Sequence, residues 1–124
     1  MSKVVYTPNA PEAIGPYSQA IVAGGLVFTS GQIPINPATG NIEAVTIEEQ
    51  TEQVCKNISA VLTAAGTSIE KVVKTVCFLS DMNDFAAFNA VYAKYFTGKP
   101  ARSCVAVKTL PKNVLVEVDT IAEI

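Results

Sequence analysis

Residues Pro100–Val107 read Pro-Ala-Arg-Ser-Cys-Val-Ala-Val, a mostly apolar run that begins with a cation. Arg102 is the only arginine among the nine cationic residues of this 124-residue chain. A guanidinium is a rigid planar fork that binds a carboxylate or phosphate through two parallel hydrogen bonds. The stretch therefore predicts a strand that carries an anion-binding arginine. The residues alone leave a second interpretation open, in which Arg102 pairs with a carboxylate of its own chain.

The segments around this strand predict further strands and two helices. The strands are expected over residues 3–6, 20–23, 26–30, 72–79, 101–107 and 114–122. The first helix is expected to begin at a Thr46 cap and to end before Gly66, and the second to follow Asp81 or Asn83. The order βββαβαββ predicts a single α+β domain over residues 1–124, in which one mixed sheet packs against two helices.

Glu117 is the main candidate for proton transfer, because it lies in the middle of the last predicted strand, where an unpaired charge is costly. Glu117 either neutralises Arg102 directly, or both face a cleft in which Arg102 holds an anion and Glu117 moves protons. A carboxylate partly withdrawn from water has a raised pKa and exchanges protons near neutrality. The chain has no histidine, which excludes Ser-His-Asp and Cys-His catalysis and leaves this work to a carboxylate.

Two further polar residues each have a functional and a structural interpretation. Cys104 shares a strand face with Arg102 and is interpreted either as a nucleophile or as a residue that lines the pocket. Asn89 lies beside the apolar stripe of the second helix, where it either forms a local backbone tie or contacts a ligand.

The composition predicts a protein that associates with itself. Hydrophobic residues make up 49% of the chain and charged residues only 16%, so a monomer would expose large apolar patches. A net charge of −2 argues against nucleic-acid binding, which needs a basic face. Three dispersed cysteines predict neither a zinc site nor a disulfide framework and suit a reducing cytoplasm. No stretch predicts a signal peptide or a membrane span.

Four motifs resemble the RidA (reactive intermediate deaminase, or YjgF-like) family. Residues 100–107 with Leu110-Pro111 and Val116-Glu117-Val118 resemble its signature. The similarity extends, in order, to residues 14–20, 29–34 and 81–85, with Asn89 and Tyr92 after them. Two departures are the short 97–99 link, expected to change the rim of the cleft, and Val118 in place of a larger residue.

The resemblance implies a chorismate-mutase-like fold and a homotrimer with clefts between its subunits. It implies hydrolysis of 2-imino acids, the tautomers of enamines such as 2-aminoacrylate, to 2-keto acids and ammonia. Pyridoxal-phosphate enzymes such as dehydratases would release these intermediates, and the deaminase itself would use no cofactor or metal. Arg102 would hold the substrate carboxylate and Glu117 would activate water. The implied pocket residues are Tyr17, Ser30, Gly31, Asn89 and Cys104.

Two other functions stay open at this point. The same cleft would serve a non-catalytic sensor of small carboxylates, or the chain would act as an interaction protein. Binding can do without a proton shuttle, so the deaminase and the sensor differ in their need for Glu117.

Overall fold

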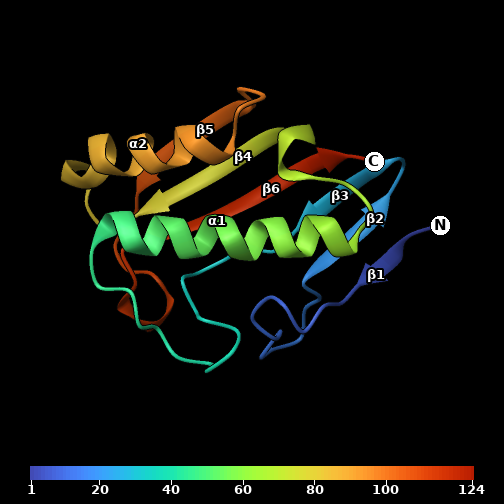
Figure 1. The fold of residues 1–124 in the computed structure, drawn as a ribbon, viewed down its shortest axis with the longest axis horizontal. Helices are drawn as coiled ribbons and strands as arrows, with labels where there is room; N and C mark the ends of the chain where they lie inside the picture. Colours follow the sequence, from blue (N-terminus) through green and yellow to red (C-terminus); the bar gives the residue numbers. More distant parts are fainter.

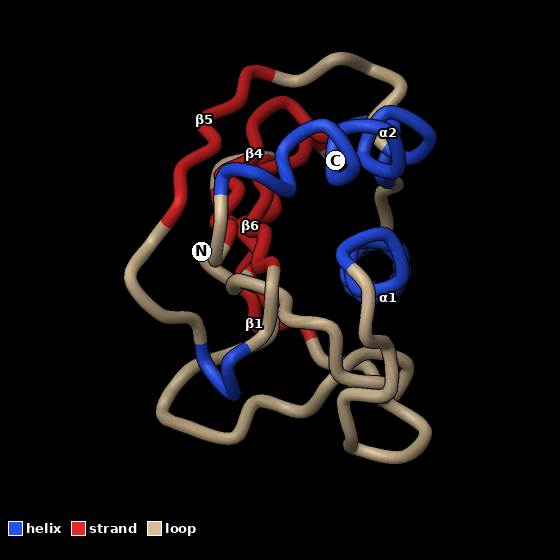
Figure 2. The backbone as a smooth tube through the Cα atoms, turned by 90° about the vertical axis from the view of Figure 1, so that its left-hand side faces the viewer, coloured by secondary structure: helices blue, strands red, loops and turns tan.

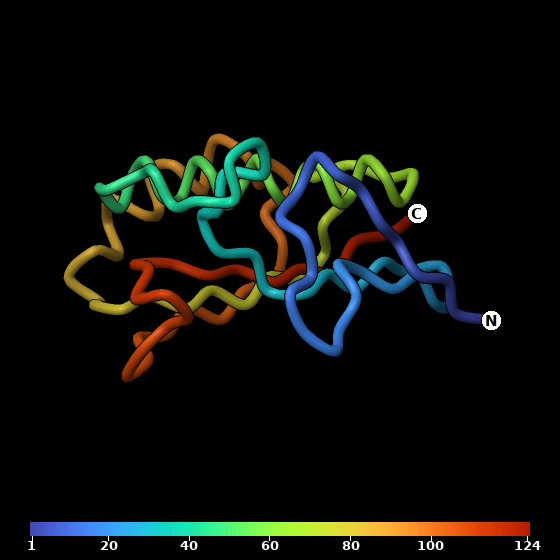
Figure 3. Tube along the Cα trace, turned by 90° about the horizontal axis from the view of Figure 1, so that it is seen from below, coloured from blue at the N-terminus to red at the C-terminus, as the bar shows by residue number.

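The computed structural model describes all 124 residues. The chain folds into one six-stranded sheet with both helices packed on one face (Figures 1 and 3). The strand order is β1-β2-β3-β6-β4-β5. The strands are β1 (Lys3–Val5), β2 (Ala20–Ala23), β3 (Leu26–Thr29), β4 (Val72–Leu79), β5 (Ala101–Ala106) and β6 (Val116–Glu123). The helices are α1 (Ile47–Ala64) and α2 (Phe85–Tyr95), with short 3-10 turns at Ile69–Lys71, Met82–Asp84 and Pro111–Asn113. This arrangement confirms the predicted α+β class and mixed sheet.

The sheet is antiparallel except at one edge. β1, β2 and β3 form a meander, β6 pairs with both β3 and β4, and only β5 runs parallel to its neighbour β4. The turn between β2 and β3 is Gly24-Gly25, whose φ angles of 59° and 77° suit a tight hairpin. A parallel neighbour requires a crossover, and α2 supplies it between β4 and β5.

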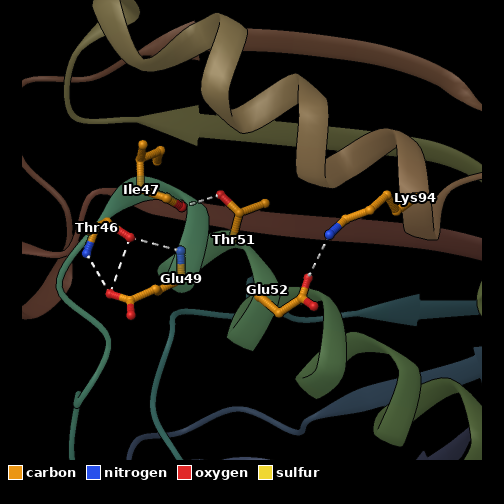
Figure 4. Close-up of polar contacts among 6 residues, drawn as sticks. All are labelled: Thr46, Ile47, Glu49, Thr51, Glu52 and Lys94. Carbon is orange, nitrogen blue, oxygen red and sulfur yellow. Dashed lines mark hydrogen bonds and ion pairs between the residues drawn. The ribbon is translucent and has the colours of Figure 1, made fainter.

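Helix α1 has the boundaries that its capping residues predict. Thr46 Oγ1 accepts a hydrogen bond from the Glu49 amide at 3.1 Å, and the Glu49 carboxylate accepts one from the Thr46 amide at 3.2 Å (Figure 4). At the other end, Gly66 has φ 89°, and the amides of Gly66 and Thr67 donate to the carbonyls of Thr63 and Leu62. This is the Schellman arrangement that a C′ glycine permits.

The helices and the sheet form two layers (Figure 2), and the buried residues of both form one hydrophobic core between them. It is closed by fully buried side chains from both layers: Val54, Ile58, Val61, Leu62, Cys77, Leu79, Phe88, Val116 and Val118. The opposite face of the sheet has no helix over it, and Phe28 and Val105 are exposed there. No helix has both the length and the apolar character needed to cross a membrane.

The last strand begins two residues later than predicted. Leu115 leaves the ladder because its amide donates to the Gln50 side chain at 2.8 Å, which ties the segment to α1. Val114 follows the 3-10 turn and is buried without being part of β6. Alternation of apolar residues continues through Val114, so the pattern alone could not locate this break.

Candidate active site

Arg102 faces the helix layer from the edge strand β5. It pairs with Thr75 in the parallel ladder, and Thr75 Oγ1 is hydrogen-bonded at 2.8 Å to the hydroxyl of Tyr92 on α2. Arg102 Nη1 donates to Asn89 Oδ1 at 2.7 Å. The arginine therefore points at α2 and is held by a neutral amide.

Arg102 forms no ion pair with any carboxylate of its chain. The chain's one ion pair joins Lys94 Nζ to Glu52 Oε2 at 4.0 Å, between α2 and α1 (Figure 4). Helix α2 presents Asn89 one turn before Tyr92, so the amide and the ring reach the guanidinium from the same side. This geometry places Asn89 at the arginine, as the ligand-contact interpretation requires, and its side chain forms no backbone tie.

Glu117 projects from the other face of the sheet. It pairs with Phe78 in the antiparallel β4–β6 ladder, whereas the adjacent pair Cys77–Val118 is buried under the helices. Burial is the main cause that raises the pKa of Glu117, and the charge of Asp119 two residues on raises it further. The carboxyl is therefore suited to accept and release a proton at a higher pH than a free glutamate.

Gly31 lies directly against the Glu117 carboxyl group. A Cβ placed on Gly31 would overlap Oε2 and would lie 2.9 Å from Cδ, so no larger residue fits without moving the glutamate. The segment is fixed on both sides: the Ser30 amide donates to the Gln19 carbonyl at 2.9 Å, and the Gln32 amide to the Val118 carbonyl at 2.8 Å. The glycine predicted for the pocket is therefore the site of a close backbone approach.

A cavity of about 600 Å³ opens beside Glu117. Its walls include Tyr17, Ser30, Gly31 and Glu117, which brings four of the predicted site residues together. Tyr17 is 51% exposed. Ser30 Oγ donates to the Ser18 carbonyl at 2.6 Å and so fixes the turn that carries Tyr17. We call this cavity the Glu117 half-site.

A second cavity, of about 550 Å³, is lined by Arg102 and Asn89 together with Tyr92 and the 97–100 segment. Gly98 in that segment packs against the Glu70 carbonyl, where a Cβ would lie 2.8 Å from the oxygen. The short link therefore forms a fixed rim, with Lys99 at φ 52°. We call this cavity the Arg102 half-site.

The two half-sites lie on opposite faces of one sheet, so a single chain does not bring Arg102 and Glu117 together. The interpretation in which Glu117 directly neutralises Arg102 within the chain is therefore wrong. The register is the physical reason: Arg102 pairs with Thr75 and Glu117 with Phe78, three residues apart on β4, and successive strand residues alternate between faces.

Cys104 lies on the Arg102 face but lines neither cavity. It pairs with Cys77, and burial raises the pKa of its thiol despite the nearby Arg102 charge. Burial also raises the pKa of Cys77 to about 12. Both thiols are therefore protonated at neutral pH, which argues against the nucleophile interpretation.

Four residues that position the site were not assigned from the sequence. Gln19 is buried; its carboxamide accepts from the Thr7 amide at 2.7 Å and donates to the Pro11 carbonyl at 2.8 Å, which fixes the 7–11 loop. Gln32 bridges to β6, and Phe85 and Tyr92 lie against Arg102. A glutamine next to a predicted strand, as at Gln19, was a usable signal, whereas the two aromatic residues had the spacing of an ordinary core.

No group of three or more cysteine, aspartate and glutamate side chains lies close enough to hold a metal ion. What the arrangement offers is a cationic fork, an amide, hydroxyls and one carboxyl of raised pKa. The Arg102 half-site can bind a small carboxylate, and the Glu117 half-site can transfer protons.

Comparison with known proteins gives a consistent result over the whole chain. The model of the family described as "Endoribonuclease L-PSP" matches residues 7–124. The chain is 48% identical to the 2-iminobutanoate/2-iminopropanoate deaminase of Escherichia coli K12 and 53% identical to the putative regulator AldR of Lactococcus lactis, each over 98% of both chains. A Yersinia pestis structure described as a conserved Rid protein family member, YyfA, superposes with a TM-score of 0.97 at 52% identity over 100% of both chains. The chain therefore belongs to the RidA (YjgF-like) family that its motifs resemble.

Proposed function

We propose that the protein is a 2-imino acid deaminase that hydrolyses 2-iminopropanoate and 2-iminobutanoate, the tautomers of the corresponding enamines, to 2-keto acids and ammonia. The observation that carries the proposal is an arginine with no carboxylate partner, complemented by a glutamate of raised pKa. The 48% identical relative named for this reaction supports the same substrates.

The chemistry needs few groups because an iminium carbon is already electrophilic. Arg102 holds the substrate carboxylate through the donors that Asn89 leaves free. Glu117 accepts a proton as water adds to the iminium carbon, which gives a carbinolamine. Glu117 returns this proton to the carbinolamine nitrogen, and the C–N bond breaks. The hydroxyl oxygen gives up its own proton as the carbon–oxygen double bond forms, and that proton leaves with ammonia as ammonium. Positioning and one carboxylate are sufficient for both steps.

The proposal requires that the two half-sites come from different subunits. Arg102 and Glu117 lie on opposite faces of one sheet, and the open face that carries Glu117 is partly apolar, with Phe28 and Val105 exposed. We infer a homotrimer in which each cleft combines the Arg102 half-site of one chain with the Glu117 half-site of its neighbour. The low charge content of the chain supports burial of this face.

The substrates are expected from enzymes that eliminate water from hydroxyamino acids with pyridoxal phosphate, since such reactions release enamines. The deaminase would then act without a cofactor of its own, in the cytoplasm where these enzymes work. The partners under this proposal are small imino and keto acids and further copies of the chain.

A second candidate function is a sensor that binds small carboxylates without turnover. The relative named a putative regulator, 53% identical over the same length, favours this candidate. A sensor needs the Arg102 half-site but has no use for a proton-accepting Glu117. Turnover by the unmodified protein that is lost in Glu117→Gln would support the deaminase, whereas carboxylate binding without turnover by the unmodified protein would support the sensor.

The test generates 2-iminobutanoate with a threonine dehydratase in the presence of semicarbazide, which traps the free imine. The protein is expected to accelerate formation of 2-oxobutanoate at the expense of the semicarbazone. Arg102→Ala is expected to abolish the acceleration, while Lys3→Ala, which removes an exposed cation, is the matched control. Absence of any acceleration by the unmodified protein would overturn the deaminase proposal.

A further inference from the structure

We propose that Phe85 and Tyr92 are positioning residues that hold the Arg102 guanidinium ready for a carboxylate ligand. The inference rests on the proposed function of that arginine and assigns two aromatic residues, otherwise part of the core, to the site. Both lie on α2, so the helix that crosses from β4 to β5 also orients the cation on β5.

Both rings lie within cation–π distance of the guanidinium. Arg102 Cζ is 4.8 Å from the centroid of Tyr92 and 5.3 Å from that of Phe85. Cations within about 6 Å of a ring centroid are attracted by the negative face of the ring. Together with the Asn89 hydrogen bond, three residues on consecutive turns of one helix contact the same guanidinium.

The Tyr92 ring is itself fixed, so it can act as a rigid support. Its hydroxyl is hydrogen-bonded to Thr75 Oγ1 at 2.8 Å, and its ring stacks on Phe96 with 4.4 Å between centroids. The ring of Phe88, on the same helix, lies 5.5 Å from the Tyr92 ring, measured between centroids. Thr75 is also the strand partner of Arg102, so one residue of β4 anchors both the ring and the backbone of the arginine.

This arrangement orients the cation without neutralising it. A guanidinium has five N–H donors, and the hydrogen bond to Asn89 is the one that its side chain forms within the chain. A carboxylate in place of the rings would have to be displaced by the ligand. Aromatic faces and a neutral amide leave both the charge and the remaining donors available, which is what preorganised anion binding requires.

The competing interpretation is that the rings are core residues that happen to touch Arg102. The two interpretations differ in how the ring effect depends on the arginine. If the rings act through Arg102, replacing a ring weakens carboxylate binding only while the arginine is present. If they are merely structural, replacing a ring changes stability and leaves binding by the folded protein unchanged.

The experiment measures pyruvate binding by calorimetry and KM and kcat for 2-iminobutanoate. Phe85→Leu is expected to weaken pyruvate binding and raise KM by roughly three- to fivefold, as loss of one partly exposed cation–π contact implies. In kcat we expect a smaller change. Tyr92→Phe keeps the ring face and is expected to bind within twofold of the unmodified protein, while Tyr92→Leu binds less well.

Tyr95→Leu is the matched control, because Tyr95 lies on the same helix but lines a cavity without Arg102. It is expected to leave pyruvate binding unchanged. A double-mutant cycle with Arg102→Lys, which keeps a charge but loses the planar fork, is expected to remove most of the Phe85→Leu effect. Thermal unfolding of each variant identifies those that fail to fold.

Three outcomes would count against the proposal. A folded Phe85→Leu and a folded Tyr92→Leu that both bind pyruvate normally would overturn it. A Phe85→Leu effect of equal size in the Arg102→Lys background would assign the rings a structural role only. If the unmodified protein neither binds pyruvate nor hydrolyses the imine, the proposed function itself fails and the positioning role fails with it.

Discussion

Arg102 and Glu117 project from opposite faces of the same sheet, because their partners on β4, Thr75 and Phe78, are an odd number of residues apart. No side-chain rotation can bring the two groups together within one chain. Each group is nevertheless suited to its proposed role: the arginine has no carboxylate partner, and the glutamate is partly withdrawn from water.

Mixed assemblies of two inactive variants should regain activity. Arg102→Ala subunits keep an intact Glu117 half-site, and Glu117→Gln subunits keep an intact Arg102 half-site. Random mixing of equal amounts in a cyclic trimer should leave roughly a quarter of the clefts with both halves intact, and so restore roughly a quarter of the activity of the unmodified protein, because each cleft draws one half from each of two neighbours. The measurement is deaminase activity after co-refolding, with each variant refolded alone as control.

A mixture no more active than its components would place the whole site within one chain and contradict the proposed assembly. The same samples should elute in solution at three times 13.1 kDa. A stable monomer would contradict the trimer directly.

Gly31→Ala should reduce kcat by at least about tenfold, the size of loss that a misplaced catalytic group causes. The new methyl group would occupy the position of the Glu117 carboxyl and displace it. Gly40→Ala is the matched control, since Gly40 has φ 76° in an open turn with no atom within 4 Å of a new Cβ. It should cost stability through backbone strain and leave kcat unchanged. Normal turnover by a folded Gly31→Ala would show that the position of Glu117 is not critical.

The pH dependence should reveal the raised pKa of Glu117. Activity should fall as the pH drops through that raised value, at a higher pH than for an unperturbed carboxyl of pKa 4.5, because the base must be ionised. Asp119→Asn removes the neighbouring charge and should move this acid limb to lower pH. The profile of kcat/KM against pH measures both, and an acid limb unchanged by Asp119→Asn would argue against Glu117 as its source.

The same raised pKa has an opposite effect on stability. The native state binds a proton more tightly than the unfolded chain, so the free energy of unfolding falls as pH rises from 4.5 through the raised pKa. Glu117→Gln removes this penalty and should be more stable than the unmodified protein at pH 7, with the advantage lost below pH 4.5. Urea unfolding at the two pH values tests the sign, and equal stability at both would contradict it.

Asn89→Asp should weaken substrate binding more than Asn89→Ala. The aspartate is nearly isosteric and would place a carboxylate at hydrogen-bond distance from Arg102, where it competes with the substrate. Asn89→Ala removes the hydrogen bond to Arg102 but adds no carboxylate that competes with the substrate. We expect KM to rise by about tenfold for the aspartate, on the scale of one charge-assisted hydrogen bond. Equal KM values for the two variants would mean that Arg102 does not bind the substrate carboxylate.

Thr46→Ala should destabilise the protein by about 1 kcal/mol, the usual cost of losing an N-cap. Thr46 Oγ1 accepts from the Glu49 amide in a reciprocal capping box (Figure 4). The box is exposed, and Thr46 lines neither half-site. Thr46→Ser keeps the acceptor and should lie within a few tenths of a kcal/mol of the unmodified protein. Denaturant unfolding measures both, and a loss in Thr46→Ser as large as in Thr46→Ala would assign the effect to packing.

Short sequence signals correctly predicted both ends of α1 and the hairpin between β2 and β3. The capping box at Thr46, the C′ glycine at Gly66 and the Gly24-Gly25 hairpin each determine backbone geometry within a few residues. The boundary at Val116 could not be found this way, because it depends on the Leu115 amide reaching Gln50 on a distant helix. Strand order and register are likewise non-local, and they decide which face each site residue occupies.

The site residues likewise divide into those that the sequence identifies and those whose role depends on non-local packing. Arg102 and Glu117 could be identified from the sequence, because Arg102 is the only arginine and Glu117 is a carboxylate in the middle of a predicted strand. Their separation depends on the pairing of both with β4, which the chain order does not reveal. Phe85 and Tyr92 were missed because an aromatic stripe on a helix is the normal appearance of a core, and only the ring-to-guanidinium distances distinguish their role.

The placement of the two half-sites on opposite sheet faces has a consequence for how catalysis scales with protein amount. In the proposed assembly an isolated folded chain contains no complete reaction centre, so the specific activity should depend on subunit concentration. Dilution below the dissociation constant of the trimer would then stop turnover while leaving every chain folded. The equilibrium between free and assembled chains would itself act as the control over the enzyme.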